Sequence, residues 1–454
     1  MNNPINNSDN LNLDLNLNFL NLFFLMLFIS LVVFDLTVYK FIWGIEGIAR
    51  YFNLFSLIFF TFFSLICMTY MKLSIQIWAF IILPSLMMFM SSFLNISRYA
   101  LQDSSIISFY GSLLPIAVMI AIPFLSKLNV INTSKIFSYY YIAILSIVSV
   151  SLLEYFLVFS GYMQPSLITT SGGTFMATNF SILFDLEDNI YNETDFSPSF
   201  YASIIESGSL AMLVLPAMIY GLINRYYVGF VILLISLIAT VSLGGFLSLF
   251  LFAVIYPYVE NKIYDVKKTT MRSLFFFFYI LVFIVMAGFI IDFLIDFFNE
   301  KFTVVGIGIN DRATSGSTRI DNITMLFGNL PSILIENPLG YELSTSSDEI
   351  FKNNFYGFNV GLGIAIYNGG FLSFVGYIIL TIIFMMASIS TLLKKKLSRD
   401  NVVAASSILV LLPFFLQRGS IFETSILVLL TTPFVIEYLN NKDNNAHDLN
   451  KGNL

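Results

Sequence analysis

The residues best suited to chemistry are arginines in and around a polar stretch, 299–359, that lies between two long apolar stretches. Arg312 and Arg319 lie within it, among threonines, serines and glycines, and Arg98 and Arg418 lie in short loops between apolar segments. A guanidinium keeps its charge at any relevant pH, and its planar fork matches phosphate oxygens bidentately. Because most of the surrounding sequence is apolar, we expect these four arginines to bind an anionic, lipid-attached group at a membrane surface.

Arg319 has the most favourable local position of the four. The segment 320–330 has the pattern of an amphipathic helix, and Thr318 with Asp321 fits the capping box that begins one. Arg319 would then stand in the first turn, where free backbone N–H groups and the helix dipole favour an anion. We expect this helix to end near Pro331. The alternative for the arginines is pairing with lipid phosphates or with nearby carboxylates, namely Asp311, Asp321 and Glu336.

Catalysis by histidine is excluded, because the only histidine, His447, lies in the polar stretch 439–454. A Ser-His-Asp hydrolase and a histidine-ligated metal site are therefore not expected, and we predict no metal and no cofactor. A general base must then be a carboxylate, and Glu206 is the best placed catalytic candidate. Glu154 also lies in an apolar stretch. We expect Glu154 and Glu206 to pair with arginines, because an isolated charge at membrane depth is costly.

The composition is that of a membrane protein. Of 454 residues, 57% are hydrophobic and only 11% are charged, whereas a soluble protein has about 25% charged residues. We predict an all-α polytopic membrane protein with about 12 transmembrane helices, with the lipid bilayer as a partner and no nucleic acid. The expected spans are 19–38, 51–71, 73–92, 108–125, 137–160, 205–223, 227–241, 243–259, 274–297, 365–391, 402–417 and 421–438. Between the two short spans at 227–241 and 243–259, residues 240–245 predict a tight hairpin.

Lysines and arginines concentrate in one set of alternate loops, whereas the loop 161–204 carries five acidic residues and no basic one. Because basic loops of membrane proteins face the cytoplasm, we predict that both termini lie inside. The basic loops hold Lys72, Lys127, Lys135, Arg225, Lys262, Lys267, Lys268, Arg272, Lys394, Lys395, Lys396 and Arg399.

The same orientation defines the expected organisation of the chain. Residues 1–18 and 439–454 are cytoplasmic tails, and 19–298 is a bundle of about nine spans with the outer loop 161–204. Residues 299–359 form a large outer loop between the ninth and tenth spans. Residues 360–438 hold an interfacial segment and the last three spans.

The order of several short motifs resembles a known family. Glu206 opens a span after a polar outer loop, a Thr-x-Ser hairpin follows at 240–242, and the large outer loop carries paired arginines. Asn337-Pro338-Leu339-Gly340 forms a turn, and an Asn-Gly-Gly-Phe-Leu segment at 368–372 leads into the next helix. Over about 197–384 this order resembles the O-antigen and lipid-linked oligosaccharide polymerases of the Wzy type and the related O-antigen ligases. The ligases typically have a histidine where this chain has Phe358-Asn359, which favours a polymerase.

The resemblance implies polymerisation of undecaprenyl-pyrophosphate-linked oligosaccharide repeat units on the periplasmic face of the bacterial inner membrane. In the family, arginines of the large periplasmic loop serve the pyrophosphate, a role that falls here on Arg312 and Arg319. The implied reaction is an inverting glycosyl transfer without metal or nucleotide, and the implied protein partners are a chain-length-regulating co-polymerase and a flippase. The alternatives are an O-antigen ligase and a lipid-linked oligosaccharide flippase or transporter.

Overall fold

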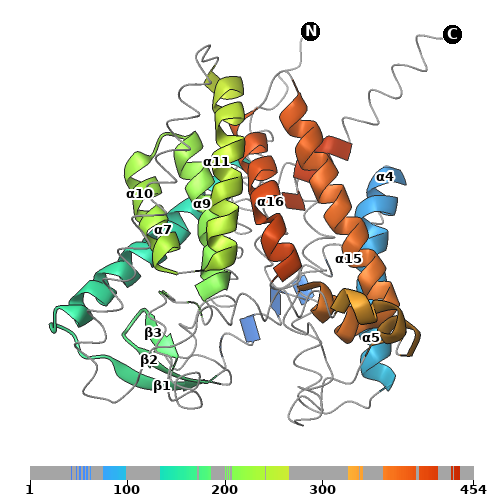
Figure 1. Ribbon diagram of the computed structural model, residues 1–454, viewed down its shortest axis with the longest axis horizontal. Helices are drawn as coiled ribbons and strands as arrows, with labels where there is room; N and C mark the ends of the chain where they lie inside the picture. The colour runs from blue at the N-terminus through green and yellow to red at the C-terminus, as the bar shows by residue number, and fades with distance from the viewer. Residues whose placement is uncertain are drawn as a thin grey trace, which may run out of the picture.

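The fold is mostly helical, with one small β-sheet (Figure 1). A computed structural model describes residues 75–98, 133–170, 173–185, 207–240, 242–264, 326–336, 338–340, 361–394 and 398–417. It also describes residues 42, 48, 51, 52, 55, 56, 58, 59, 62, 200, 202, 204, 431, 432 and 434–439. Structural statements below concern these residues.

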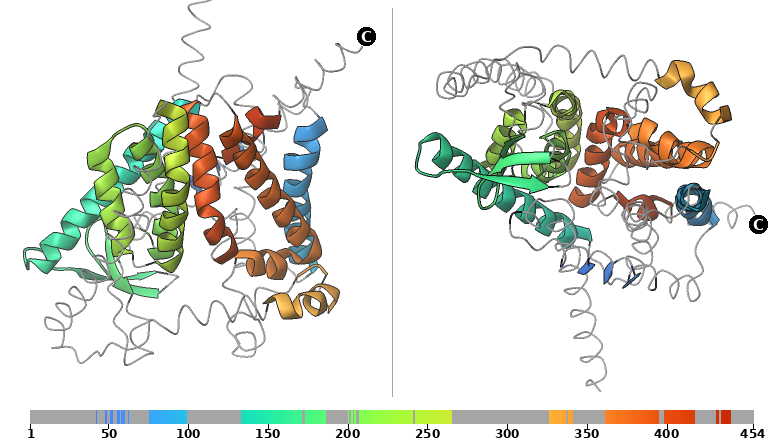
Figure 2. Two further views of the ribbon diagram at one scale, coloured as in Figure 1. Left: turned by 45° about the horizontal axis from the view of Figure 1, so that its top comes forward. Right: turned by 90° about the horizontal axis from the view of Figure 1, so that it is seen from below.

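The helices form an upright bundle, seen from three sides in Figures 1 and 2. Two of them contain stretches long and apolar enough to cross a membrane, Lys135–Val158 and Gly369–Leu393. The elements in chain order are α4 (Ile75–Ile77), η1 (Trp78–Ile82), α5 (Leu83–Arg98), α7 (Thr133–Phe159), α9 (Ser207–Ile223), α10 (Tyr227–Ala239), α11 (Leu243–Tyr264), α15 (Gly361–Leu393) and α16 (Arg399–Gln417). A further apolar helix, Leu326–Glu336, precedes α15.

Seven of the expected spans coincide with these helices within a few residues. The expected hairpin is confirmed, because α10 ends at Ala239 and α11 begins at Leu243. The spans expected at 19–38, 108–125 and 274–297 lie outside the described residues, as do most of 51–71 and 421–438. The mostly helical architecture is therefore established for the described part of the chain.

Helix α16 lies at the centre of the bundle. It packs against α9, α11 and α15, and its residues from Val402 to Ser407 are all buried. Small side chains at 404–407, Ala-Ala-Ser-Ser, allow the neighbouring helices to approach closely. The hydroxyl of Ser407 donates to the carbonyl of Val403 at 2.6 Å, so it needs no partner on a neighbouring helix. This core holds the helices that surround it in fixed positions.

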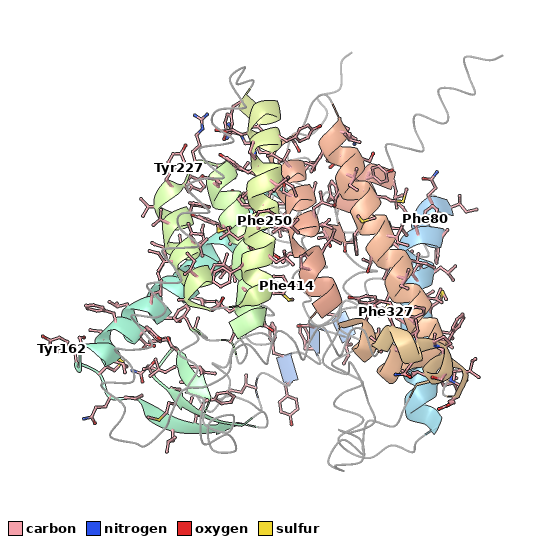
Figure 3. The ribbon with its side chains drawn as sticks, viewed as in Figure 1. Phe80, Tyr162, Tyr227, Phe250, Phe327 and Phe414 are labelled. Atoms are coloured by element: carbon pink, nitrogen blue, oxygen red, sulfur yellow. The ribbon has the colours of Figure 1, made fainter. Side chains whose placement is uncertain are left out.

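The bundle has two ends with different features. We call "sheet end" the one that carries the β-sheet, the start of α9, the α10–α11 turn and helix Leu326–Glu336 (Figure 1). Figure 3 shows Tyr162, Phe327 and Phe414 toward this end and Tyr227 toward the opposite one. We call that opposite end, with Arg225, Tyr264 and Arg399, the "basic end". The predicted outer loops and the predicted basic loops therefore lie at different ends wherever their residues are described.

The expectation of an all-α fold is wrong in one segment. Residues 166–185 form an antiparallel sheet of β1 (Ser166–Thr170), β2 (Gly173–Ala177) and β3 (Ile182–Asp185), in that order. Thr170 pairs with Gly173, which leaves the two-residue connection of a tight hairpin. Threonine, isoleucine and phenylalanine favour extended backbone. These strands have four or five residues each, too short to appear in a search for spans of about 20 residues.

The expected end of the helix after Arg319 is also wrong. The helix does not stop near Pro331 but continues to Glu336, while its expected start lies outside the described residues. Leu326 is buried, and Leu330, Ile333 and Leu334 pack against the core. These residues form one apolar stripe at helical spacing. Burial of that stripe outweighs the missing N–H of the proline.

Helices α7 and α10 can approach each other because residue 229 is a glycine. This contact can be tested with two substitutions, one on each helix. A Cβ at Gly229 would lie 1.8 Å from the hydroxyl oxygen of Tyr141 and 3.0 Å from its ring carbon. We expect Gly229→Ala to lower the free energy of unfolding by roughly 1–3 kcal/mol, as overpacked cores do. The cost should shrink in a Tyr141→Phe background, where the hydroxyl is gone.

Thermal unfolding of the four proteins of this double-mutant cycle measures the coupling. Gly328→Ala is the control, because a Cβ there meets nothing within 4 Å. Equal destabilisation by Gly229→Ala with and without the Tyr141 hydroxyl contradicts the described packing.

Candidate functional site

Of the candidate residues from the sequence, the structure describes Arg98, and it lies at the sheet end. Arg98 is the last residue of α5, and that helix ends at the sheet end (Figures 1 and 2). Glu206 directly precedes α9 and Arg418 directly follows α16, but both lie outside the described residues. Arg312 and Arg319 also lie outside them. The start of α9 and the end of α16 are at the sheet end too.

A turn within the large polar stretch 299–359 is joined to α15 by a backbone hydrogen bond. The N–H of Phe371 donates to the carbonyl of Pro338 at 2.8 Å. The turn expected at 337–340 is confirmed at residues 338–340, with Gly340 at φ +90°. Two motifs some 30 residues apart in the sequence, the Asn-Pro-Leu-Gly turn and the Asn-Gly-Gly-Phe segment, therefore meet in space.

A glycine makes this junction possible. Gly370 breaks α15 with φ +61° and ψ −146°, a conformation open essentially to glycine alone. A Cβ at this position would lie 2.1 Å from the carbonyl oxygen of Pro338. Beside it, the hydroxyl of Ser91 on α5 donates to the carbonyl of Gly369. The break in α15 is thus held from two sides, by the turn and by α5.

The described polar centre of the sheet end is Glu154, in the last part of α7. Its side chain is buried, and Oε2 accepts from the Ser181 hydroxyl at 2.8 Å and from the Phe180 N–H at 3.1 Å. The hydroxyl of Thr178 is a third donor to the same oxygen. The described partners of Glu154 are neutral, and its expected pairing with an arginine stays a prediction, because Arg312, Arg319 and Arg418 lie outside the described residues. Three donors replace the hydration that a buried carboxylate loses.

This carboxylate attaches the sheet to the bundle. Thr178 and Ser181 close the turn between β2 and β3, with the N–H of Thr178 donating to the carbonyl of Ser181 at 2.8 Å. Because both hydroxyls also contact Glu154, the turn is fixed against α7. Residues that sequence reasoning missed here are Thr178 and Ser181. The sequence alone could not identify these two hydroxyl side chains as partners of Glu154, because only the fold brings them to it.

The segment that leads to Glu206 is fixed to the same structure. The N–H of Ile182 in β3 donates to the carbonyl of Ala202 at 2.6 Å, and the N–H of Phe200 donates to the carbonyl of Ala239 at 2.8 Å. The ring of Phe200 is fully buried and meets the ring of Tyr155 edge to face. Phe200 and Ala202 are therefore held between β3 and the end of α10, a few residues before the start of α9.

The surroundings of Glu154 suit a residue that holds other segments in place rather than one that binds a metal ion. Among the described residues, no group of three His, Cys, Asp or Glu side chains could hold a metal ion. Metal independence of the reaction itself stays a prediction. Glu154 uses one oxygen for three donors, which fits a residue that positions the segment before Glu206. Glu206 stays the predicted catalytic carboxylate.

Glu154→Ala tests the attachment of the sheet. We expect it to leave one N–H and two hydroxyls without their acceptor and to lower the free energy of unfolding by roughly 1–3 kcal/mol. Cleavage of the 161–204 segment in limited proteolysis should also become faster. Glu336→Ala, which removes an exposed carboxylate, is the control. Unchanged proteolysis in Glu154→Ala would show that the three hydrogen bonds do not hold the sheet.

Gly370→Ala tests the junction. We expect loss of the Phe371–Pro338 contact and easier cleavage around 338–340, because the new Cβ and the carbonyl oxygen of Pro338 cannot occupy their present places. Gly328→Ala is again the control. Proteolysis of the folded protein at the wild-type rate would contradict the described junction.

Comparison with known proteins adds no assignment to this geometry. No protein family, curated protein or solved structure matches the chain.

Proposed function

We propose that the protein polymerises undecaprenyl-pyrophosphate-linked oligosaccharide repeat units at the outer face of the bacterial inner membrane. The observation that supports this most is the joining of the Asn-Pro-Leu-Gly turn to the Asn-Gly-Gly-Phe segment. It anchors a turn of the arginine-bearing stretch 299–359 at the sheet end, where α5 ends in Arg98. The positions next to Glu206 and Arg418 belong to helix ends on that same side.

The membrane setting is part of the proposal. The apolar stretches of α7 and α15 have 24 and 25 residues, and at 1.5 Å per residue each is about 36 Å long, enough to cross the ~30 Å hydrocarbon core. We propose about 12 spans in all, with the basic end and both termini in the cytoplasm and the sheet end outside. Exposed apolar side chains along α7, such as Ile142, Leu153 and Phe156, are suited to contact with lipid.

The proposed reaction joins two lipid-linked glycans. A hydroxyl oxygen of one repeat unit attacks the anomeric carbon of another glycan, from the face opposite its bond to undecaprenyl pyrophosphate. The new glycosidic bond forms as the bond to the pyrophosphate oxygen breaks, and the configuration at that carbon inverts. The hydroxyl proton passes to a carboxylate, and undecaprenyl pyrophosphate leaves with the bonding electrons. This step needs no oxidant, nucleotide or further reactant.

Each candidate residue has a role in this reaction. Arg319 and Arg312 bind the pyrophosphate and stabilise the charge that develops on it, and Arg98 and Arg418 add positive charge at the same end. Glu206 accepts the proton of the attacking hydroxyl. Glu154 is a positioning residue, since its hydrogen bonds fix the sheet to which the segment before Glu206 is attached.

A deletion strain complemented with variants tests the proposal. Without the protein, we expect single repeat units on the lipid A core but no long-chain ladder on a lipopolysaccharide gel. Wild-type protein should restore the ladder. Arg319→Ala should not restore the ladder, because it loses roughly 2–4 kcal/mol of transition-state stabilisation. Arg319→Lys should restore the ladder only in part, because the guanidinium fork is lost.

Lys135→Ala, an exposed cation at the basic end, is the matched control and should restore the ladder at equal expression. Loss of even the single-unit band in the deletion strain would indicate a transporter instead. A full ladder from Arg319→Ala at equal expression would remove Arg319 from the site.

A further inference from the structure

The basic end contains a second cationic arrangement that the polymerase reaction does not use. Three chain segments meet there: the link between α9 and α10 with Arg225, the end of α11 with Tyr264, and the start of α16 with Arg399. The Cζ of Arg225 lies 4.0 Å from the centroid of the Tyr264 ring, and the Cζ of Arg399 lies 5.6 Å from it. Both distances are within the range of cation–π attraction.

The ring that collects the two arginines is itself fixed. The hydroxyl of Tyr264 donates to the carbonyl of Ile223, the last residue of α9. The ring therefore stays beside the α9–α10 link, and both guanidinium groups are held near it. Two like charges gathered on one ring repel each other, so an anion between or above them would lower the energy of the arrangement.

Arg225 holds its place in an unusual backbone conformation. Its N–H donates to the carbonyl of Leu222 at 3.1 Å, and the N–H of Tyr226 donates to the carbonyl of Gly221 at 2.7 Å. These two bonds form a Schellman motif, in which the residue with positive φ is usually glycine. Here it is Arg225, with φ +63°. A side chain kept where glycine would fit better indicates that the guanidinium has a use.

No described carboxylate forms an ion pair with either arginine. Both arginines are exposed, and neither forms an ion pair within the described residues. Three described carboxylates belong to this region: Glu260 near the end of α11, Asp400 in the first turn of α16, and Glu437, which accepts from the Asn401 side chain at 3.1 Å. The adjoining Tyr226 and Tyr227 are exposed aromatic residues of the kind that lie at membrane interfaces.

We propose that Arg225 and Arg399, held around Tyr264, form a binding site for a phosphate group at the basic end of the bundle. The phosphodiester of an anionic phospholipid and a soluble phosphate ester share this chemistry. The guanidinium forks supply bidentate hydrogen bonds, and the Tyr264 ring lies close to both of them. The site lies at the opposite end from the start of α9 and the Pro338–Phe371 junction, so it stands whether or not the proposed polymerase reaction is correct.

The test uses the purified full-length protein in detergent and follows its unfolding midpoint. The probes are phosphatidylglycerol, phosphatidylcholine of the same acyl chains, and glycerol 3-phosphate at constant ionic strength. We expect phosphatidylglycerol or glycerol 3-phosphate to raise the midpoint and phosphatidylcholine to have no such effect. In Arg225→Gln/Arg399→Gln the apparent affinity should fall by roughly twenty- to thirtyfold, about fivefold for each cation.

The matched control is Lys135→Gln/Lys394→Gln, which removes the same charge from the same end without touching the ring. Its midpoint should rise as in the wild type. A rise produced by glycerol 3-phosphate identifies a soluble phosphate ester, and a rise produced only by phosphatidylglycerol identifies a lipid headgroup. Equal affinity in the arginine and lysine variants, or no rise in the wild type with either phosphate, overturns the proposal.

Arg225→Gly separates binding from folding. Glycine fits φ +63° without strain, so the midpoint of this variant without probe should equal or exceed that of the wild type, while its apparent affinity for the phosphate probe should fall about fivefold. A variant that keeps the full rise would exclude Arg225 from the site.

Discussion

The hydrogen bond from the Phe371 N–H to the Pro338 carbonyl is the constraint on which the proposed site depends. Where a helix breaks inside an apolar bundle, its free N–H groups must find acceptors within the protein. Here the acceptor comes from a turn within the arginine-bearing stretch. The hydrogen bond that satisfies the break in α15 therefore also fixes one point of that stretch against the bundle. The absence of a Cβ at Gly370 is what lets the two backbones meet.

A second buried group organises the other half of the sheet end. Glu154 gathers the Thr178 and Ser181 hydroxyls and a backbone N–H, so the sheet is fixed to α7 by hydrogen bonds from neutral donors. Removing an acceptor from such a group is costly because each buried donor then lacks a partner. The carboxylate thus helps to hold the sheet in place. Ala202, before α9, is in turn hydrogen-bonded to the sheet, and Phe200 is hydrogen-bonded to the end of α10.

The two ends of the bundle differ in whether their charged side chains are buried or exposed. At the sheet end, the described charge of Glu154 is buried and surrounded by donors. At the basic end, Arg225 and Arg399 are exposed and are held by an aromatic ring. Helix α16 connects these regions through a core of small and branched side chains, so neither end can shift without repacking the bundle.

The sequence by itself determined the helical elements, because apolar length and turn residues are local properties. It located the α10–α11 hairpin from Thr240 to Gly245 and the turn at Gly340, and its basic loops anticipated a charge difference between the ends. It missed the sheet, whose short strands carry little local signal. It also ended a helix at Pro331, whereas the helix continues to Glu336 and packs Ile333 and Leu334 against the core. Only the tertiary structure paired Pro338 with Phe371, Glu154 with Ser181, and Arg225 with Tyr264. Such partners are distant in sequence, and only packing selects them from the many groups of equal hydrogen-bonding capacity.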